Sequence, residues 1–458
     1  MSSGSVQHIP LTPLDDGLPL PSEQARYHLL SSRPRSPHLH RWQDGAQARL
    51  LVVNGSRLFD LTPELAARID AAVARGTEAE LLSQLGIDGA ALIDDAVPAP
   101  MPVHAFSLAV AQRCNLGCTY CYAQQGDFGG EARNMPVETA LLAVDQLLGQ
   151  TPEGGKFNLA FMGGEPLVNR RVLRAATEHA VEQAAARGLK PTFSITTNGT
   201  LLTAEDADFF EQHGFAVTIS LDGVGDTHDQ LRPFKGGKGS FERIMRNLQP
   251  LLRRQQRMQV SARVTVTPHN LRLQPMLEQF LQAGFYTVGF SPMLSSPNGQ
   301  AEMGGRELDV LLDEMIACGE VFEAHARRGE RYGFANLLNA LREIGKGTHR
   351  PYPCGAGAGY LGVSASGNLY ACHRFVDDDA GAMGDLSHGV DQTRQSQWLA
   401  ERHVHQQSPC RQCWARYQCG GGCHHEVIGR GRAACDYVRG WLQYCMGVYG
   451  RLGALAAH

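Results

Sequence analysis

The sequence predicts an α/β protein built around a parallel sheet that forms a partial (β/α)6 barrel of the TIM type. Apolar segments of strand length alternate with helical segments between residues 106 and 290, and a cysteine-rich motif directly follows the first strand. The expected strands are Phe106–Val110, Asn158–Met162, Thr192–Thr196, Val217–Leu221, Val260–Val266 and Thr287–Phe290. The expected helices are Val137–Leu148, Arg171–Arg187, Ala204–His213, Phe241–Arg254 and Leu273–Ala283. In such a barrel the chemistry lies at the carboxyl ends of the strands.

Length and composition indicate a globular protein with several domains. The 458 residues are enough for about three domains, and 43% are hydrophobic. A net charge of -4 argues against general nucleic-acid binding, and no apolar run reaches the ~18 residues of a membrane-spanning helix. The N-terminus lacks a secretory signal, so we expect a cytoplasmic protein. In that reducing compartment the twelve cysteines indicate metal binding or catalysis rather than disulfides.

Five units are expected along the chain. They are a flexible tail over residues 1–25, a compact module over 26–97, the barrel over 104–305, a helical bridge over 306–350 and a Gly- and Cys-rich domain over 351–458. In the module, Leu50–Val53 and Arg57–Phe59 predict a hairpin, because Asn54-Gly55 supplies the positive φ angles of a tight turn. Two helices follow, one from the N-cap Thr62 and one near Glu78 to Leu85. The last domain has too little apolar core to fold without metal.

The first cysteine motif lies directly after the first barrel strand. Cys114, Cys118 and Cys121 have the spacing C-x-x-x-C-x-x-C. Three thiolates in one loop can hold three irons of a [4Fe–4S] cluster and leave the fourth iron open for another ligand. The alternative is a zinc site, but structural zinc requires four ligands.

This motif resembles that of the radical SAM superfamily, whose cluster binds S-adenosylmethionine and generates a carbon-centred radical. Further matching positions follow the second to fifth strands. The matching residues are Tyr120, Gly163, Gly164, Glu165, Pro166, Asn198, Ser220, Asp222 and Arg263, and the resemblance implies that they bind S-adenosylmethionine. Asp229 and Arg232 also fit the family pattern, with a surface ion pair as the alternative interpretation.

The C-terminal cysteines resemble the SPASM extension of radical SAM enzymes that modify peptides. By that resemblance, one auxiliary [4Fe–4S] cluster has four ligands and a second has three. The four are Cys410, Cys413, Cys419 and Cys435, and the three are Cys354, Cys372 and Cys423. Cys445 could complete the second set, or the position could stay open for a substrate thiolate. A zinc ribbon is the alternative for the 410–423 group, and Cys318 is expected to be a buried small hydrophobe.

Together these features resemble radical SAM maturases of ribosomally made peptides. The N-terminal module is similar to the winged-helix-like elements that bind a leader segment as an extra strand. The resemblance implies two partners, a peptide or small protein with a leader and an electron donor such as flavodoxin or ferredoxin. It implies an oxidative cross-link, either a thioether, as in the maturase of quinohaemoprotein amine dehydrogenase, or a carbon–carbon bond. His373 stands where sulfatase-maturating relatives carry an acidic residue, which argues against formylglycine formation. Peptide epimerisation and a zinc-dependent scaffold are the alternatives.

Overall fold

A parallel sheet organises the chain. A computed structural model describes residues 36–99 and 102–456, so the expected tail over 1–25 lies outside the described residues. The central strands lie in the order β10-β9-β8-β7-β6-β4, and each pairs with its neighbours in parallel. They are β4 (Ala105–Gln112), β6 (Lys156–Gly163), β7 (Lys190–Thr197), β8 (Ala216–Ser220), β9 (Gln259–Val266) and β10 (Thr287–Pro292). All six strands predicted from the sequence are confirmed.

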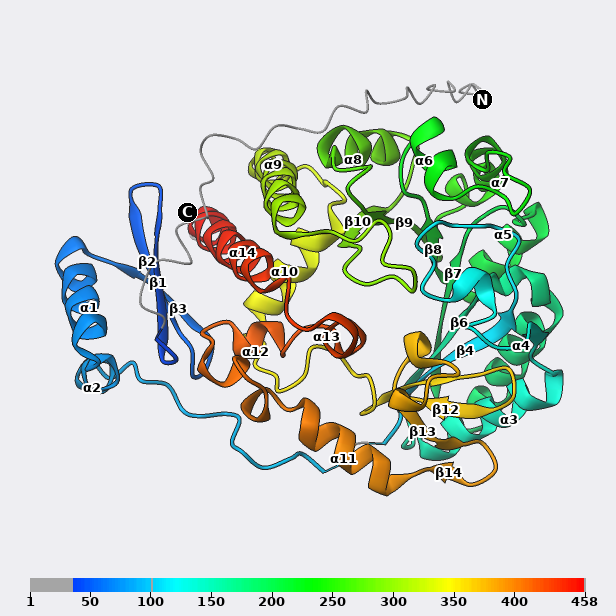
Figure 1. Cartoon of the computed structure of the whole chain (residues 1–458), viewed down its shortest axis with the longest axis horizontal. Helices are drawn as coiled ribbons and strands as arrows, with labels where there is room; N and C mark the ends of the chain where they lie inside the picture. The colour runs from blue at the N-terminus through cyan, green and yellow to red at the C-terminus, as the bar shows by residue number, and fades with distance from the viewer. Residues whose placement is uncertain (1–35, 100–101, 457–458) are drawn as a thin grey trace.

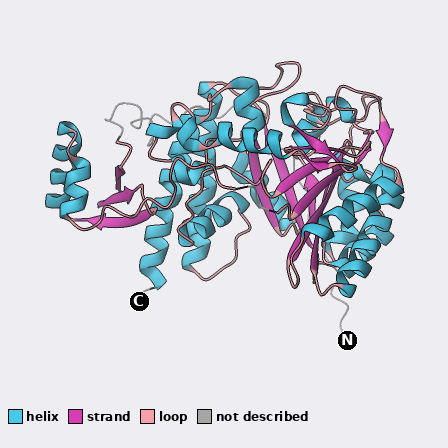
Figure 2. Ribbon diagram, turned by 90° about the horizontal axis from the view of Figure 1, so that it is seen from below, coloured by secondary structure: helices cyan, strands magenta, loops and turns pink. Residues whose placement is uncertain are grey.

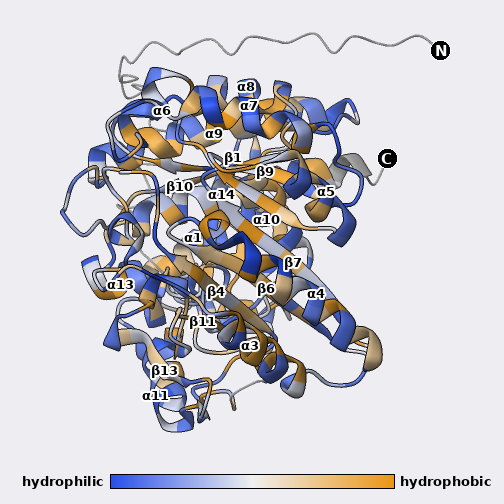
Figure 3. Cartoon of the chain, turned by 90° about the vertical axis from the view of Figure 1, so that its right-hand side faces the viewer, coloured by the Kyte–Doolittle hydropathy of each residue, from blue (hydrophilic) through white to orange (hydrophobic). Residues whose placement is uncertain are grey.

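The helices between these strands cover the outer side of the sheet (Figure 1). They are α3 (Val137–Gln150), α4 (Arg170–Ala186), α5 (Ala204–His213), α6 (Asp226–Leu231), α7 (Phe241–Leu252) and α8 (Leu273–Gln282). Local sequence fixes the ends of α5, because Thr203 and Asp206 form a reciprocal capping box and Gly214 ends the helix at φ 64°. Figure 3 shows apolar colours along the strands and polar colours on the outer faces of the helices.

The C-terminal region extends the same sheet, which the sequence analysis did not predict. The strand β11 (Tyr360–Val363) pairs in parallel with β4, so that β4 lies between β6 and β11. Three short antiparallel strands continue from it: β12 (Asn368–Tyr370), β13 (Ala382–Asp385) and β14 (Gly389–Val390). With β5 (Arg133–Asn134), which pairs with β4, the sheet has 11 strands rather than six. These strands are too short to give a clear alternating pattern.

Six helices complete the C-terminal half. The bridge consists of α9 (Gly305–Arg327) and α10 (Ala335–Gly345), as its helical character predicted. Three short helices follow: α11 (Gln392–Arg402), α12 (Arg416–Cys419) and α13 (His424–Arg430). The last helix, α14 (Cys435–Ala456), packs against α9 and α10. In Figure 1, α12 and α13 lie on the side of the sheet opposite α3 to α5. Within the described residues, no helix is long and apolar enough to cross a membrane.

The N-terminal module is a small unit at one side of the larger domain (Figure 2). Its three antiparallel strands are β1 (Leu39–Asp44), β2 (Gln47–Val52) and β3 (Arg57–Leu61), followed by α1 (Pro63–Arg75) and α2 (Glu78–Gln84). The expectation of two strands was wrong, because β1 also pairs with β2 along its whole length. The Asp44-Gly45 turn, with Gly45 at φ 61°, is a signal that could have revealed it.

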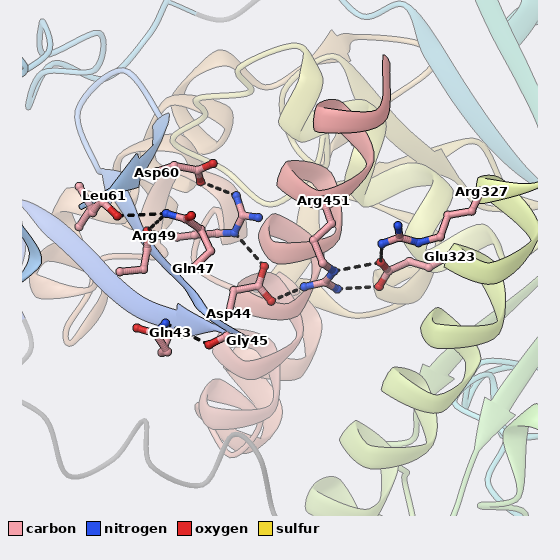
Figure 4. A network of polar contacts seen from close by, with 11 residues as sticks. Gln43, Asp44, Gly45, Gln47, Arg49, Asp60, Leu61, Glu323, Arg327 and Arg451 are labelled. Atoms are coloured by element: carbon pink, nitrogen blue, oxygen red, sulfur yellow. Dashed lines mark hydrogen bonds and ion pairs between the residues drawn. The ribbon is translucent and has the colours of Figure 1, made fainter. Parts of the chain in front are cut away.

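Apolar and charged contacts join this module to the larger domain. Trp42, Leu51 and Val53 share a buried cluster with residues of the C-terminal region. Beside it, the network in Figure 4 runs from the module through Arg451 on α14 to Glu323 on α9. The Arg451 Nη2 donates to Glu323 Oε1 at 2.6 Å, and Arg451 also pairs with Asp44. The side chains of Arg451, Glu323 and Asp44 are 28%, 10% and 12% exposed, so the network is largely shielded from solvent.

We therefore expect Arg451→Ala to loosen the attachment of the module. The substitution leaves Asp44 and Glu323 without their shared partner, which should cost about 2 kcal/mol. Amide hydrogen exchange in β1 to β3 should become faster, because the module opens more often. Arg328→Ala is the matched control, since Arg328 pairs with Glu330 at an exposed position. If β1 to β3 exchange at the same rate in the two variants, the network does not hold the module against the larger domain.

Candidate functional site

The first cysteine motif lies in the loop that follows β4. The three thiols influence one another electrostatically, which places Cys114, Cys118 and Cys121 together at the carboxyl end of the sheet. Burial raises the pKa of Cys118 to about 12 and also raises the pKa of Cys114. Buried thiols therefore ionise only when positive charge is supplied, as a bound metal cluster does. This donor set fits an iron–sulfur cluster.

A largely buried arginine lies beside this loop. Arg232, directly after α6, donates from Nη1 to the Tyr120 hydroxyl at 2.9 Å and lies 3.4 Å from Asp222 Oδ2. Burial lowers the pKa of Arg232, but the thiolate of Cys118 and the carboxylate of Asp222 outweigh it and raise the pKa overall. Arg232 is thus paired with Asp222 inside the site, whereas Asp229 accepts hydrogen bonds from the backbone of residues 240 and 241. The surface ion pair considered from the sequence is wrong.

Two glycines at the end of β6 let the backbone pack against the cysteine loop. Gly163 has φ +142°, and a Cβ atom there would lie 2.2 Å from the Ala111 carbonyl oxygen. A Cβ atom on Gly164 would lie 2.4 Å from the Arg113 oxygen. Any side chain at either position would push β6 away from β4. The Gly-Gly pair therefore leaves backbone groups, rather than side chains, beside the cysteine loop.

The next residue of this motif holds the strand ends together. Glu165 is fully buried, and its carboxylate accepts hydrogen bonds from the Thr197 hydroxyl and the Asn198 backbone N–H, both at 2.7 Å. It also accepts from the Leu167 N–H at 3.0 Å, where Pro166 begins a 3-10 turn over Pro166–Asn169. Burial raises the pKa of Glu165, and these donors oppose the rise. The carboxylate thus joins β6 to the end of β7.

The remaining predicted residues line neighbouring strand ends. Asn198 donates from Nδ2 to Asn115 Oδ1 at 3.0 Å and approaches Cys114 Sγ at 3.7 Å. Ser220 is the register partner of Arg263, and the Arg263 guanidinium contacts the Ser291 hydroxyl on β10. The structure therefore places Asn198 beside the cysteine loop and Ser220 beside Arg263 on neighbouring strands.

The C-terminal cysteines form two groups. Cys354, Cys372 and Cys423 influence one another electrostatically. The members of the second group also influence one another; they are Cys410, Cys413, Cys419 and Cys435. They line a cavity of about 110 Å³ together with Cys423 of the first group and residues of α13. Burial raises the pKa of Cys372 to about 12 and that of Cys410 to about 11.

The two other cysteines lie apart from these groups. Cys445 is fully buried in α14. Burial raises its pKa, and a hydrogen bond with its own backbone opposes the rise. The residues whose pKa it influences are Tyr437 and Tyr444. The structure therefore does not bring Cys445 to the group of three. Cys318 is fully buried in α9 and belongs to the main hydrophobic core.

The spacing within the cysteine groups bears on the zinc alternative. In the described part of the chain, no three His, Cys, Asp or Glu side chains converge tightly enough to hold one metal ion. A zinc ion with Zn–S bonds of ~2.3 Å would draw its sulfurs to within about 4 Å of one another. The described side chains therefore do not form such a converged zinc set.

Sequence reasoning missed an aromatic bridge between the first and the C-terminal cysteines. The Tyr122 ring contacts His373 edge-on, and Tyr360 shares a 2.8 Å hydrogen bond with His373 Nδ1. Arg374 lies over the Tyr122 ring and pairs with Glu426 on α13. Burial, followed by the charge of Arg374, lowers the pKa of His373 to about 3. Tyr122 directly follows Cys121, and this adjacency was the available signal.

Comparison with known proteins identifies the class. Residues 108–287 match the family model of the radical SAM superfamily. The structure is similar to that of native anSMEcpe with bound AdoMet, with a TM-score of 0.64 and 18% identity over 77% of this chain and 99% of that one. Residues 108–287 therefore form a radical SAM domain, and enzymes with this domain use a [4Fe–4S] cluster and S-adenosylmethionine.

Its relatives include maturation enzymes. The serine-type anaerobic sulfatase-maturating enzyme of Klebsiella aerogenes is 25% identical over 74% of this chain and 84% of that protein. The sporulation killing factor maturation protein SkfB of Bacillus subtilis is 27% identical over 49% of this chain and 50% of that protein. This chain is therefore a radical SAM enzyme related to maturases of proteins and peptides.

Proposed function

We propose that the enzyme forms an oxidative cross-link, by preference a thioether, within a ribosomally made peptide. The observation that carries this proposal is the pair of C-terminal cysteine groups, one of which is joined to the first cysteine loop by Tyr122 and His373. A cross-link removes two hydrogen atoms from the substrate, so two electrons must leave it. The names of the relatives support a peptide or protein substrate.

Three cysteines would hold the radical-generating cluster. They are Cys114, Cys118 and Cys121, and the backbone of Gly163-Gly164 would receive the methionyl part of S-adenosylmethionine beside them. When bound, the cluster and S-adenosylmethionine supply the radical that takes a hydrogen atom from the substrate. The other proposed contacts are Tyr120 in the cysteine loop and Asn198, Ser220, Asp222 and Arg263 on or directly after β7, β8 and β9. Glu165 would position Asn198, because its carboxylate binds the Asn198 backbone.

The C-terminal groups would provide the acceptor for the second electron. Cys410, Cys413, Cys419 and Cys435 supply the four thiolates of a complete cluster. The group of Cys354, Cys372 and Cys423 supplies three, and Cys445 lies elsewhere in the core. A cluster held by three thiolates has room for a substrate sulfur. The proposal therefore favours a thioether over a carbon–carbon bond.

The N-terminal module would bind the leader of the substrate. In the described part of the module, β1 and β3 each have one edge without a neighbouring strand. A leader segment can add to such an edge as another strand through backbone hydrogen bonds. The Arg451 network would keep the bound leader in a fixed position relative to the barrel.

The test is the mass of the short peptide encoded nearest this gene, after anaerobic co-expression with the enzyme. We expect a loss of two hydrogens per event and missing fragment ions between the joined residues. Conversion of serine to formylglycine would cause the same mass loss but keep the complete fragment series. Cys372→Ala should prevent the cross-link, whereas Cys318→Ala is the matched control in the core. An unchanged mass in ordinary water with one deuteron gained in heavy water would identify epimerisation and overturn the proposal.

A further inference from the structure

One exposed segment of the barrel is strongly basic. Residues 233–247, here called the basic segment, comprise the loop before α7 and its first two turns. They contain Lys235, Lys238, Arg243 and Arg246 but only one acidic residue, Glu242, in a chain whose net charge is -4. All four cationic residues are exposed. Among the described residues, none of the four forms an ion pair.

The loop half of the basic segment is hydrogen-bonded to the first cysteine loop. The Gly117 N–H donates to the Pro233 carbonyl at 2.8 Å, and the Lys235 N–H donates to the Asn115 carbonyl at 3.2 Å. Leu116 and Phe234 form an isolated antiparallel bridge between these bonds. Lys235 thus lies directly over the residues that connect Cys114 to Cys118.

The helical half of the basic segment is connected to the first cysteine loop by hydrogen bonds through Thr200. The Asn247 Nδ2 donates to the Thr200 carbonyl at 2.8 Å, and the Asn115 Nδ2 donates to the Thr200 hydroxyl, also at 2.8 Å. Beneath the segment, Asp229 accepts from the backbone N–H groups of Ser240 and Phe241. These bonds hold the segment in a fixed position beside the cysteine loop.

We propose that the basic segment is the docking surface for an acidic one-electron carrier protein. The carrier gives one electron to the cluster placed at Cys114, Cys118 and Cys121, so the carrier is oxidised and the cluster reduced, and no bond or proton moves. Clustered positive charge attracts and orients an acidic partner during diffusion. Electron transfer slows steeply with distance, and this surface is separated from the proposed cluster by a single loop. The inference rests on the cluster assignment of the proposed function.

Cross-linking with a carbodiimide tests the docking independently of turnover. Purified enzyme and oxidised flavodoxin, an acidic carrier, are mixed at low salt, and lysine–carboxylate cross-links are located by mass spectrometry. We expect Lys235 and Lys238 to carry the main cross-links, and we expect these to disappear at high salt. Cross-links spread evenly over the exposed lysines, or concentrated at Lys156 and Lys190, would overturn the proposal.

A charge-reversal pair tests the function of the surface. We expect K235E/K238E to lower the flavodoxin-dependent rate of S-adenosylmethionine cleavage at least about tenfold, and to leave the dithionite-dependent rate unchanged because that small reductant needs no docking. The matched control is K156E/K190E, because Lys156 and Lys190 are exposed register partners at the opposite ends of β6 and β7. An equal loss in the two double variants, or no loss in K235E/K238E, would overturn the proposal.

Cleavage of S-adenosylmethionine by the wild type, measured once with dithionite and once with reduced flavodoxin, distinguishes a failure of the docking proposal from a failure of the proposed function. If dithionite supports cleavage but reduced flavodoxin does not at low salt, the docking proposal is overturned and the cluster assignment stands. If neither reductant supports cleavage in enzyme loaded with iron, the proposed function itself fails.

Discussion

Replacing Cys114, Cys118 and Cys121 together with alanine should abolish cleavage of S-adenosylmethionine. The three thiols are the cysteine group at the carboxyl end of β4, and none of the other nine cysteines belongs to this loop. Without their charge, the buried loop offers no anionic ligand for iron, while Arg232 remains beside it. We expect 5'-deoxyadenosine formation to fall below detection under conditions in which the wild type turns over.

The iron content of this variant distinguishes a lost site from a collapsed protein. The iron content per chain should fall by about one four-iron cluster relative to the wild type, because the two C-terminal groups keep all their cysteines. Cys318→Ala is the control, since Cys318 lies in the core away from the three groups and its removal should leave both iron content and cleavage intact. Residual cleavage by the triple variant would show that these thiols do not hold the radical-generating cluster.

Arg232→Met should be the most destabilising single substitution near the site. It leaves the fully buried Asp222 carboxylate without its partner and removes the hydrogen bond to Tyr120. Removing one member of a buried charge pair costs about 3–5 kcal/mol, because the other charge stays buried and uncompensated. The free energy of unfolding of the barrel in urea should fall by that amount.

An exposed pair provides the comparison for Arg232. Arg254 and Asp208 form an ion pair with a distance of 2.8 Å, but their side chains are 43% and 67% exposed. Arg254→Met should therefore cost less than about 1 kcal/mol. If the two variants lose similar stability, the pair of Arg232 and Asp222 contributes no more than a surface ion pair.

The sequence predicted the elements whose patterns are long and regular. Among the six central strands, β4 is an apolar run that is buried along its whole length, whereas β6 to β9 alternate buried and more exposed positions. The boundaries of all six agree with the prediction within a few residues. The grouping of the C-terminal cysteines was implied by the resemblance to the SPASM extension and not by their spacing. By contrast, β11 to β14 have only two to four residues each, so no periodicity could indicate them.

Side-chain directions in the site could not be predicted in the same way. The motif around Gly163 and Gly164 indicated a binding site, but nothing in it showed that the Glu165 carboxylate turns inward to hold β7. The partner of Arg232 could not be predicted either, because Asp229 lies only three residues before it in the sequence, whereas its actual partner Asp222 lies ten residues before it. Such choices depend on packing between strands, which becomes defined only in the folded chain.

The position of β4 between β6 and β11 has a consequence for synthesis on the ribosome. Residues 105–108 of this strand pair with residues 360–363, so this part of its edge stays unpaired until about 250 further residues have been made. An unpaired apolar edge promotes aggregation while the chain is incomplete. Because the first cysteine loop leaves from this strand, the C-terminal region must fold before that loop has its final support. Iron delivery to the first loop should therefore follow completion of the whole chain.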